Sequence, residues 1–152
     1  MFRFFKRNKD KTIKPEISVD SKWANLVDKA MKNYKSLTKN ERIWFNQRVL
    51  IDSFNDGGLI SYYYNSGAEN VYETIEDLQI LGLEKLVTII KKYNETLFHD
   101  KKVPKDINER NEFVSKLDEK TDSILQDLES DFQDQLETLE KRLETFINKE
   151  MN

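Results

Sequence analysis

The chain has 152 residues and a mass of 18.1 kDa, which is enough for one compact domain and too little for two ordinary ones. Charged residues make up 35% of the chain, against about 25% in an average globular protein, so much of the surface must be ionised. The absence of cysteine excludes disulfides, thiolate catalysis and cysteine metal sites, and the single histidine, His99, excludes multi-histidine metal centres. We therefore expect no cofactor, no metal and no enzymatic activity.

Charge is distributed unevenly along the sequence. Residues 1–15 carry six bases and one acid, for a net charge of +5, whereas residues 104–152 carry seven bases and fourteen acids, for a net charge of −7. We therefore predict a basic N-terminal head at 1–15, flexible or docked on the protein, and a single helical domain at 16–152. Residues 1–7 mix three phenylalanines with bases, a composition that suits weak contact with a membrane surface.

No run of apolar residues is long enough for a membrane span or for the core of a secretory leader. We therefore expect a cytoplasmic protein.

The first two predicted helices follow from spacing and capping. Apolar residues recur at threes and fours between residues 19 and 35, which predicts a helix over that range. Thr38 and Glu41 have the spacing of a capping box, so a second helix should begin at Thr38. The sequence Asn55-Asp56-Gly57-Gly58 ends that helix. The aromatic and β-branched segment 59–64 is ambiguous between strand and helix on propensity alone.

The remaining predicted helices are 71–81, closed by Gly82, then 83–98, and finally 117–147. Together the segments predict an all-α fold, a single compact domain of five or six helices with a long amphipathic C-terminal helix. The residues predicted to contribute to its core are Trp23, Trp44, Phe45, Tyr63, Leu78, Leu81, Leu86, Ile89, Leu125, Leu128 and Phe132.

The C-terminal helix has an apolar face and an acidic remainder. Nine acids and one base between residues 118 and 140 give this stretch a net charge of −8. The acids are Asp118, Glu119, Asp122, Asp127, Glu129, Asp131, Asp134, Glu137 and Glu140. Along a helix this is about one charge per 4 Å, whereas duplex DNA carries about one per 1.7 Å. A DNA-like surface would need further acids alongside, such as those between residues 69 and 77, or a dimer.

Several functions fit this acidic face. It suits a module that binds a basic protein, such as a DNA-binding protein that it keeps from DNA, with no direct contact to nucleic acid. An immunity protein that neutralises a nuclease toxin would use the same electrostatics. A homo-oligomeric structural protein, such as a homodimer, would instead pair through the apolar stripe. An acidic face can also simply keep a protein dispersed.

No catalytic motif accompanies these features. His99 falls in a polar stretch between predicted helices, and Gly57-Gly58 is not followed by the lysine and hydroxyl residue of a phosphate loop. Asp127, Glu129 and Asp131 have the alternation of a calcium loop, but Phe132 stands where that loop requires glycine. We therefore predict no catalytic, cofactor-binding or metal-binding residues.

The stretch from Asn55 to Gly67, with its Asn-x-Gly-Gly, aromatic run and Asn-Ser-Gly, resembles the bacterial DNA-mimic protein family. Thr38-x-x-Glu41, Leu78-x-x-Leu81-Gly82 and Leu117-Asp118-x-x-x-Asp122 add to the resemblance, which covers roughly residues 36–147. The signature residues are Asn55, Gly57, Gly58, Tyr63 and Asn65. The resemblance implies an all-helical domain in which 59–64 is helical, within a family of which one member acts by presenting DNA-like negative charge to a transcription regulator.

Overall fold

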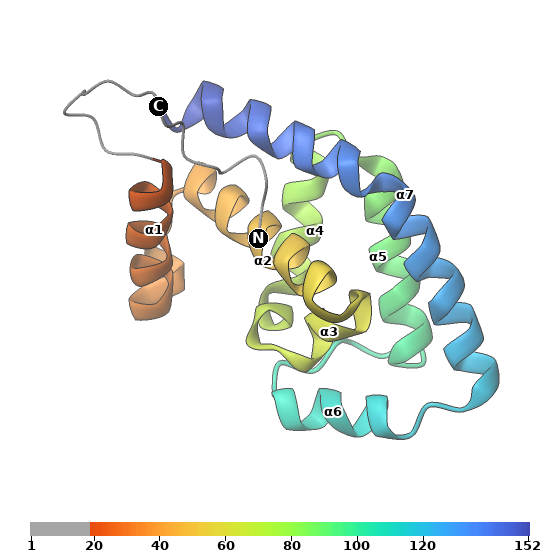
Figure 1. Cartoon of the computed structure of the whole chain (residues 1–152). Coiled ribbons are helices and arrows are strands. Elements are labelled where there is room, and N and C mark those ends of the chain that lie inside the picture. The colour runs from red at the N-terminus through yellow and green to blue at the C-terminus, as the bar shows by residue number, and fades with distance from the viewer. Residues whose placement is uncertain (1–18) are drawn as a thin grey trace.

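The computed structural model describes residues 19–152, so the predicted basic head and its membrane contact lie outside the described residues. Over 19–152 the chain forms seven α-helices, two 3-10 helices and no strand (Figure 1). The α-helices are α1 (Val19–Asn33), α2 (Lys39–Gly57), α3 (Leu59–Tyr64), α4 (Val71–Ile80), α5 (Glu84–Leu97), α6 (Ile107–Ser115) and α7 (Glu119–Glu150). The 3-10 helices are η2 (Tyr34–Ser36) and η3 (Ser66–Asn70). The all-α prediction is confirmed, whereas five or six helices is too few.

A capping box begins α2, and aromatic side chains pack α1 against α2. α1 ends two residues before its predicted end, because Asn33 adopts an extended conformation and η2 follows. The Thr38 hydroxyl accepts a hydrogen bond from the Glu41 N–H at 3.2 Å, and the Glu41 carboxylate accepts one from the Thr38 N–H at 2.9 Å. The predicted start of α2 is therefore confirmed. Trp23 of α1 lies against Trp44 of α2, with ring centroids 5.8 Å apart.

The segment 59–64 forms helix α3, as the family resemblance implied. Its buried apolar residues are Leu59, Tyr62 and Tyr63, whose spacing of three and four residues places them on one side of a helix. A strand would have put Tyr62 and Tyr63 on opposite faces. Burial of both rings thus decides the segment in favour of a helix.

α6 is the helix that the sequence pattern does not predict, and it raises the count to seven. Asp106 begins it, because its carboxylate accepts a hydrogen bond from the Asn108 N–H at 3.0 Å. Its one buried residue is Arg110, while its apolar residues are only partly covered. A helix with so little apolar burial leaves no periodic signal in the sequence.

α7 is 32 residues long, or about 48 Å, and it packs along α5 and against α2 (Figure 1). Its buried apolar residues are Leu125, Leu128, Phe132, Leu136, Leu139, Leu143 and Ile147. Because this stripe is covered by the chain's own helices, it is not free to pair with another copy. Homodimer formation stays a prediction that would require another surface.

The hydrophobic core draws its buried residues from every α-helix except α6, whose Phe113 and Val114 pack against it while partly exposed, and it matches most of the predicted residues. Nine of the eleven are buried, but Trp23 and Phe45 are only partly buried. Both lie at the contact between α1 and α2, where no other helix of residues 19–152 packs on the outer side of α1 (Figure 1). The core is therefore centred on α2, α5 and α7.

Candidate functional site

The nine acids predicted as one face of α7 lie in three different environments. Asp118, Glu119, Asp127, Asp131, Asp134 and Glu137 are exposed. Asp122 and Glu129 are partly buried, and Glu140 is buried with 7% of its surface exposed. Residues seven and eleven apart fall on the same side of a helix, so these last three share the flank that turns towards the protein. Glu140 is therefore not on a solvent-facing surface, and Asp122 and Glu129 are on it only in part.

Asp127, Asp131 and Asp134 form what we call the acidic stripe. All three are exposed, and their spacing of four and three residues aligns them on the outer side of α7 over about 10 Å. No ion pair joins any of them to another residue within 19–152. Glu137 continues the exposed side but pairs with Lys141 at 3.4 Å. The outer side of α7 thus carries three closely spaced negative charges.

Two acids at the N-terminus of α7 accept hydrogen bonds from the first turns of the helix. The Asp118 carboxylate accepts a hydrogen bond from the Thr121 N–H at 2.7 Å, and the hydrogen bonds from Thr121 lower the pKa of Asp118 below its usual 3.8. The Asp122 carboxylate accepts a hydrogen bond from the Gln126 amide at 2.8 Å. Negative charge at a helix N-terminus also interacts favourably with the helix dipole. Asp118 and Asp122 therefore help to stabilise the start of α7.

Glu129 holds the junction between α2 and α3. Its carboxylate accepts a hydrogen bond from the Leu59 N–H, and burial raises its pKa although the N–H groups of Leu59 and Ile60 oppose the change. Gly58 contacts the Glu129 carboxylate and has φ 85° and ψ 177°. A Cβ at residue 58 would come within 2.6 Å of a Glu129 carboxylate oxygen. The glycine signature and an acid 71 residues later thus form one structural joint.

The other signature residues also build this corner of the fold. The buried Tyr63 hydroxyl donates a hydrogen bond to the Asn94 side-chain carbonyl of α5. The Asn65 amide donates to the Ser61 carbonyl at 2.8 Å, across the end of α3. The remaining two signature residues, Asn55 and Gly57, are exposed at the end of α2. The signature therefore specifies the turn from α2 through α3, and the sequence had indicated it only as a motif.

Residues 35–150 match the family described as DMP19-like protein. This range contains α2 to α7, and with them both the acidic stripe and the glycine joint. The chain belongs to the DMP19-like family. The resemblance to DNA mimics is thus confirmed. No curated protein and no solved structure matches this member of the family.

In this DMP19-like chain the last two acids of α4, Glu76 and Asp77, are paired with α2. Asp77 is fully buried and forms an ion pair with Arg42 of α2, and the Asn46 amide donates to the same carboxylate at 2.9 Å. Burial raises the pKa of Asp77, while Arg42 and Asn46 oppose the change. Glu76 also pairs with Arg42, at 3.2 Å. The acids at the end of α4 are therefore engaged by Arg42 of α2.

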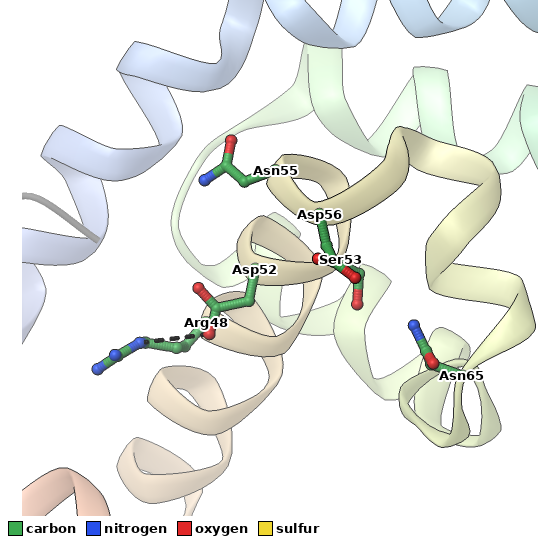
Figure 2. Close-up of a pocket in the computed structure, with 6 residues that line it drawn as sticks. All are labelled: Arg48, Asp52, Ser53, Asn55, Asp56 and Asn65. Carbon is green, nitrogen blue, oxygen red and sulfur yellow. Dashed lines mark ion pairs between the residues drawn. The ribbon is translucent and has the colours of Figure 1, made fainter. Parts of the chain in front are cut away.

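A polar depression of about 460 Å³ lies at the C-terminal half of α2 (Figure 2). Its lining residues are Arg48, Asp52, Ser53, Asn55, Asp56 and Asn65. The Arg48 guanidinium lies 3.6 Å from the Asp52 carboxylate and 4.4 Å from the centre of the Trp23 ring. Figure 2 shows the side chains pointing in different directions, with Asn55 turned away from Asn65 on the facing turn. The depression does not direct several groups towards one ligand atom.

Neither a metal cluster nor a membrane helix is found between residues 19 and 152. No group of three or more His, Asp or Glu side chains in this range is placed to hold a metal ion. No helix in the same range is long and apolar enough to cross a membrane. His99 is exposed on the turn after α5, with φ 52°, and its ring lies 6.0 Å from that of Phe113. It lies outside the polar depression.

Arg110 is the most important polar residue that the sequence did not indicate. Its side chain is completely buried and donates to four backbone carbonyls, those of Tyr63, Asn65, Pro104 and Lys105, at 2.8 to 3.1 Å. Burial lowers its pKa. It fastens α6 and the preceding loop to the end of α3. Its neighbours in sequence are polar, so only the fold shows that it is buried.

Proposed function

We propose that this protein binds the basic surface of a DNA-binding protein through the acidic stripe, Asp127, Asp131 and Asp134, and thereby keeps that protein from DNA. The observation that supports this most strongly is the stripe itself, three exposed like charges on one side of a long helix. Membership of the DMP19-like family supports a DNA-mimic role, and DNA-mimic proteins are in general non-enzymatic. The stripe is the part of this chain best suited to that role.

The helix presents these charges in a fixed arrangement. The side of α7 opposite the stripe is anchored in the core by residues such as Phe132 and Leu139, both completely buried. The partner therefore meets carboxylates whose backbone positions are already set, and little conformational entropy is lost on binding. Charges arranged in this way steer a basic partner towards the surface and increase the association rate.

The stripe is less dense than DNA but compact enough to act as one charged surface. Neighbouring charges of the stripe are spaced on average about 5 Å apart along the helix axis, whereas duplex DNA carries about one charge per 1.7 Å. The screening length at physiological ionic strength is about 8 Å, which exceeds the spacing of neighbouring carboxylates. A cationic group close to the stripe therefore interacts with more than one carboxylate. Binding should accordingly weaken steeply with added salt.

The test compares two variants with the same change in net charge. Replacing Asp127, Asp131 and Asp134 by Asn removes the stripe. Replacing three exposed acids on α5 and α6 by Gln is the matched control, and these are Glu95, Glu109 and Glu112. The wild-type chain and both variants would be immobilised, and DNA-binding proteins from the native cell would be captured, identified and purified for titration at low and high salt.

We expect the stripe variant to lose at least about tenfold in affinity at low salt and the control to lose much less. Duplex DNA should compete with the wild-type protein for the purified partner. Equal losses in the two variants, or affinity that does not respond to salt, would show that the stripe is not the binding surface. A captured partner that cleaves DNA and is inhibited by the chain would instead support the immunity hypothesis.

A further inference from the structure

A groove of about 340 Å³ runs between α5 and α7, beside the acidic stripe. It is lined by Lys85, Thr88 and Ile89 of α5 and by Asp131, Asp134 and Gln135 of α7. Two of the three stripe carboxylates therefore belong to a groove, whereas Asp127 does not line it. The three acids, alike in sequence, are thus unequal in their surroundings.

The lining combines an apolar surface with anionic edges. Ile89 is 7% exposed, so it gives the groove an apolar wall that is almost covered by its neighbours. Asp131 and Asp134, three residues apart, supply two carboxylates from one turn of α7. Lys85 supplies the one positive charge of the lining, which leaves the groove with a net charge of −1. Such a groove is complementary to a long cationic side chain.

We propose that this groove receives an arginine side chain of the basic partner, with the guanidinium against Asp131 and Asp134 and the methylene stem against Ile89. The inference rests on the proposed function and names the residue type that the stripe recognises. An arginine stem can cover apolar surface while its charged end stays at the carboxylates.

Arginine suits the groove better than lysine for two reasons. Its planar guanidinium presents several N–H donors at once and can bond to two carboxylates, whereas an ammonium is a point charge. It is also less strongly hydrated, so it loses less when it enters a partly apolar groove. Lys85 at the edge repels either cation, and Lys85→Ala should therefore increase affinity.

The experiment uses the full chain and two synthetic probes, hexa-arginine and hexalysine, titrated by calorimetry at low salt. Thr88→Trp fills the groove without changing any charge, and Thr88 is exposed, so the fold should tolerate the ring. Thr145→Trp is its matched control, because Thr145 is exposed on α7 about 16 Å along the helix from Asp134 and thus away from the groove. Asp131→Asn and Asp134→Asn are compared with Asp127→Asn. Circular dichroism verifies folding of every variant.

We expect hexa-arginine to bind several-fold more tightly than hexalysine. Thr88→Trp, Asp131→Asn and Asp134→Asn should each weaken hexa-arginine binding by about tenfold, whereas Thr145→Trp and Asp127→Asn should weaken it by less than about threefold. Equal affinity for the two peptides, or no effect of Thr88→Trp on hexa-arginine binding, would overturn the proposal that the groove receives an arginine side chain. If Thr88→Trp, Asp131→Asn and Asp134→Asn bind hexa-arginine normally while the triple Asn variant of the stripe does not, the groove is not an arginine site but the proposed function stands. If the triple variant also binds hexa-arginine normally, the proposed function is wrong as well.

Discussion

Gly58 is expected to tolerate not even the smallest substitution, because two constraints meet there. Its backbone, with φ 85° and ψ 177°, lies in a region that only glycine adopts without strain. A Cβ would also come within 2.6 and 2.9 Å of the two Glu129 carboxylate oxygens. Gly58→Ala should therefore strain the chain and displace Glu129 from the Leu59 N–H.

The cost can be worked out from these two effects. Backbone strain in this region costs about 1–3 kcal/mol. Losing a hydrogen bond to a charged group costs about 1.5–3 kcal/mol. We therefore expect the free energy of unfolding to fall by about 3–5 kcal/mol, a large part of the roughly 5–15 kcal/mol that a domain of this kind possesses.

Urea denaturation of the full chain, followed by circular dichroism, measures this loss. Gly57→Ala is the control, since Gly57 is the last residue of α2 and a Cβ there would lie 3.2 Å from the Ser61 Cβ. It should change stability by less than about 1 kcal/mol. In a double-mutant cycle with Glu129→Ala, the double variant should be more stable than the sum of the single losses predicts, by about 1.5–3 kcal/mol. Strict additivity, or equal losses at Gly57 and Gly58, would refute the reasoning.

Three further predictions concern the polar groups that hold the fold. Arg110→Met removes the donor to four buried carbonyls and should cost at least about 3 kcal/mol in urea denaturation, so a loss below about 1 kcal/mol would contradict that role. Because the pKa of Asp118 is lowered in the folded state, its charged form stabilises the fold above its usual 3.8, and this stabilisation is lost as pH falls through the lowered value. Asp118→Ala should therefore lower Tm at about pH 7 and lose that effect near pH 2, whereas a pH-independent difference would argue against the cap. Tyr63→Phe removes the donor to the buried Asn94 side chain and should cost about 1–2 kcal/mol, and a denaturation curve identical to wild type would count against this bond.

Capping motifs, glycines and apolar periodicity were sufficient to predict a helix wherever the segment itself determines its structure. The capping box at Thr38 and Glu41 begins α2, and Gly82, with φ 75°, follows α4 as predicted. The 3.6-residue period of residues 117–147 identified α7, because its apolar stripe is long and continuous. For α3 the propensities were indecisive, and the family resemblance supplied the assignment.

α6 was missed for the opposite reason, since its position depends on a bond to another segment. Its buried residue is Arg110, whose four acceptors come from α3, from the residue that follows α3 and from the loop before α6. A charged residue is normally predicted to face solvent. Only the assembled backbone brings four carbonyls to one place and makes burial of a guanidinium favourable.

The acids of α7 show most directly what each level determines. The sequence alone determined that the helix is amphipathic and carries a net charge of −8 between residues 118 and 140. It could not separate Glu129 and Glu140 from Asp127, Asp131 and Asp134, because periodicity gives the angle of a side chain around its helix but not what lies opposite. The tertiary structure places α2 and α3 beside one flank and α5 beside the other. That placement sets Glu129 at a structural joint and buries Glu140, while it leaves Asp127, Asp131 and Asp134 as an exposed stripe.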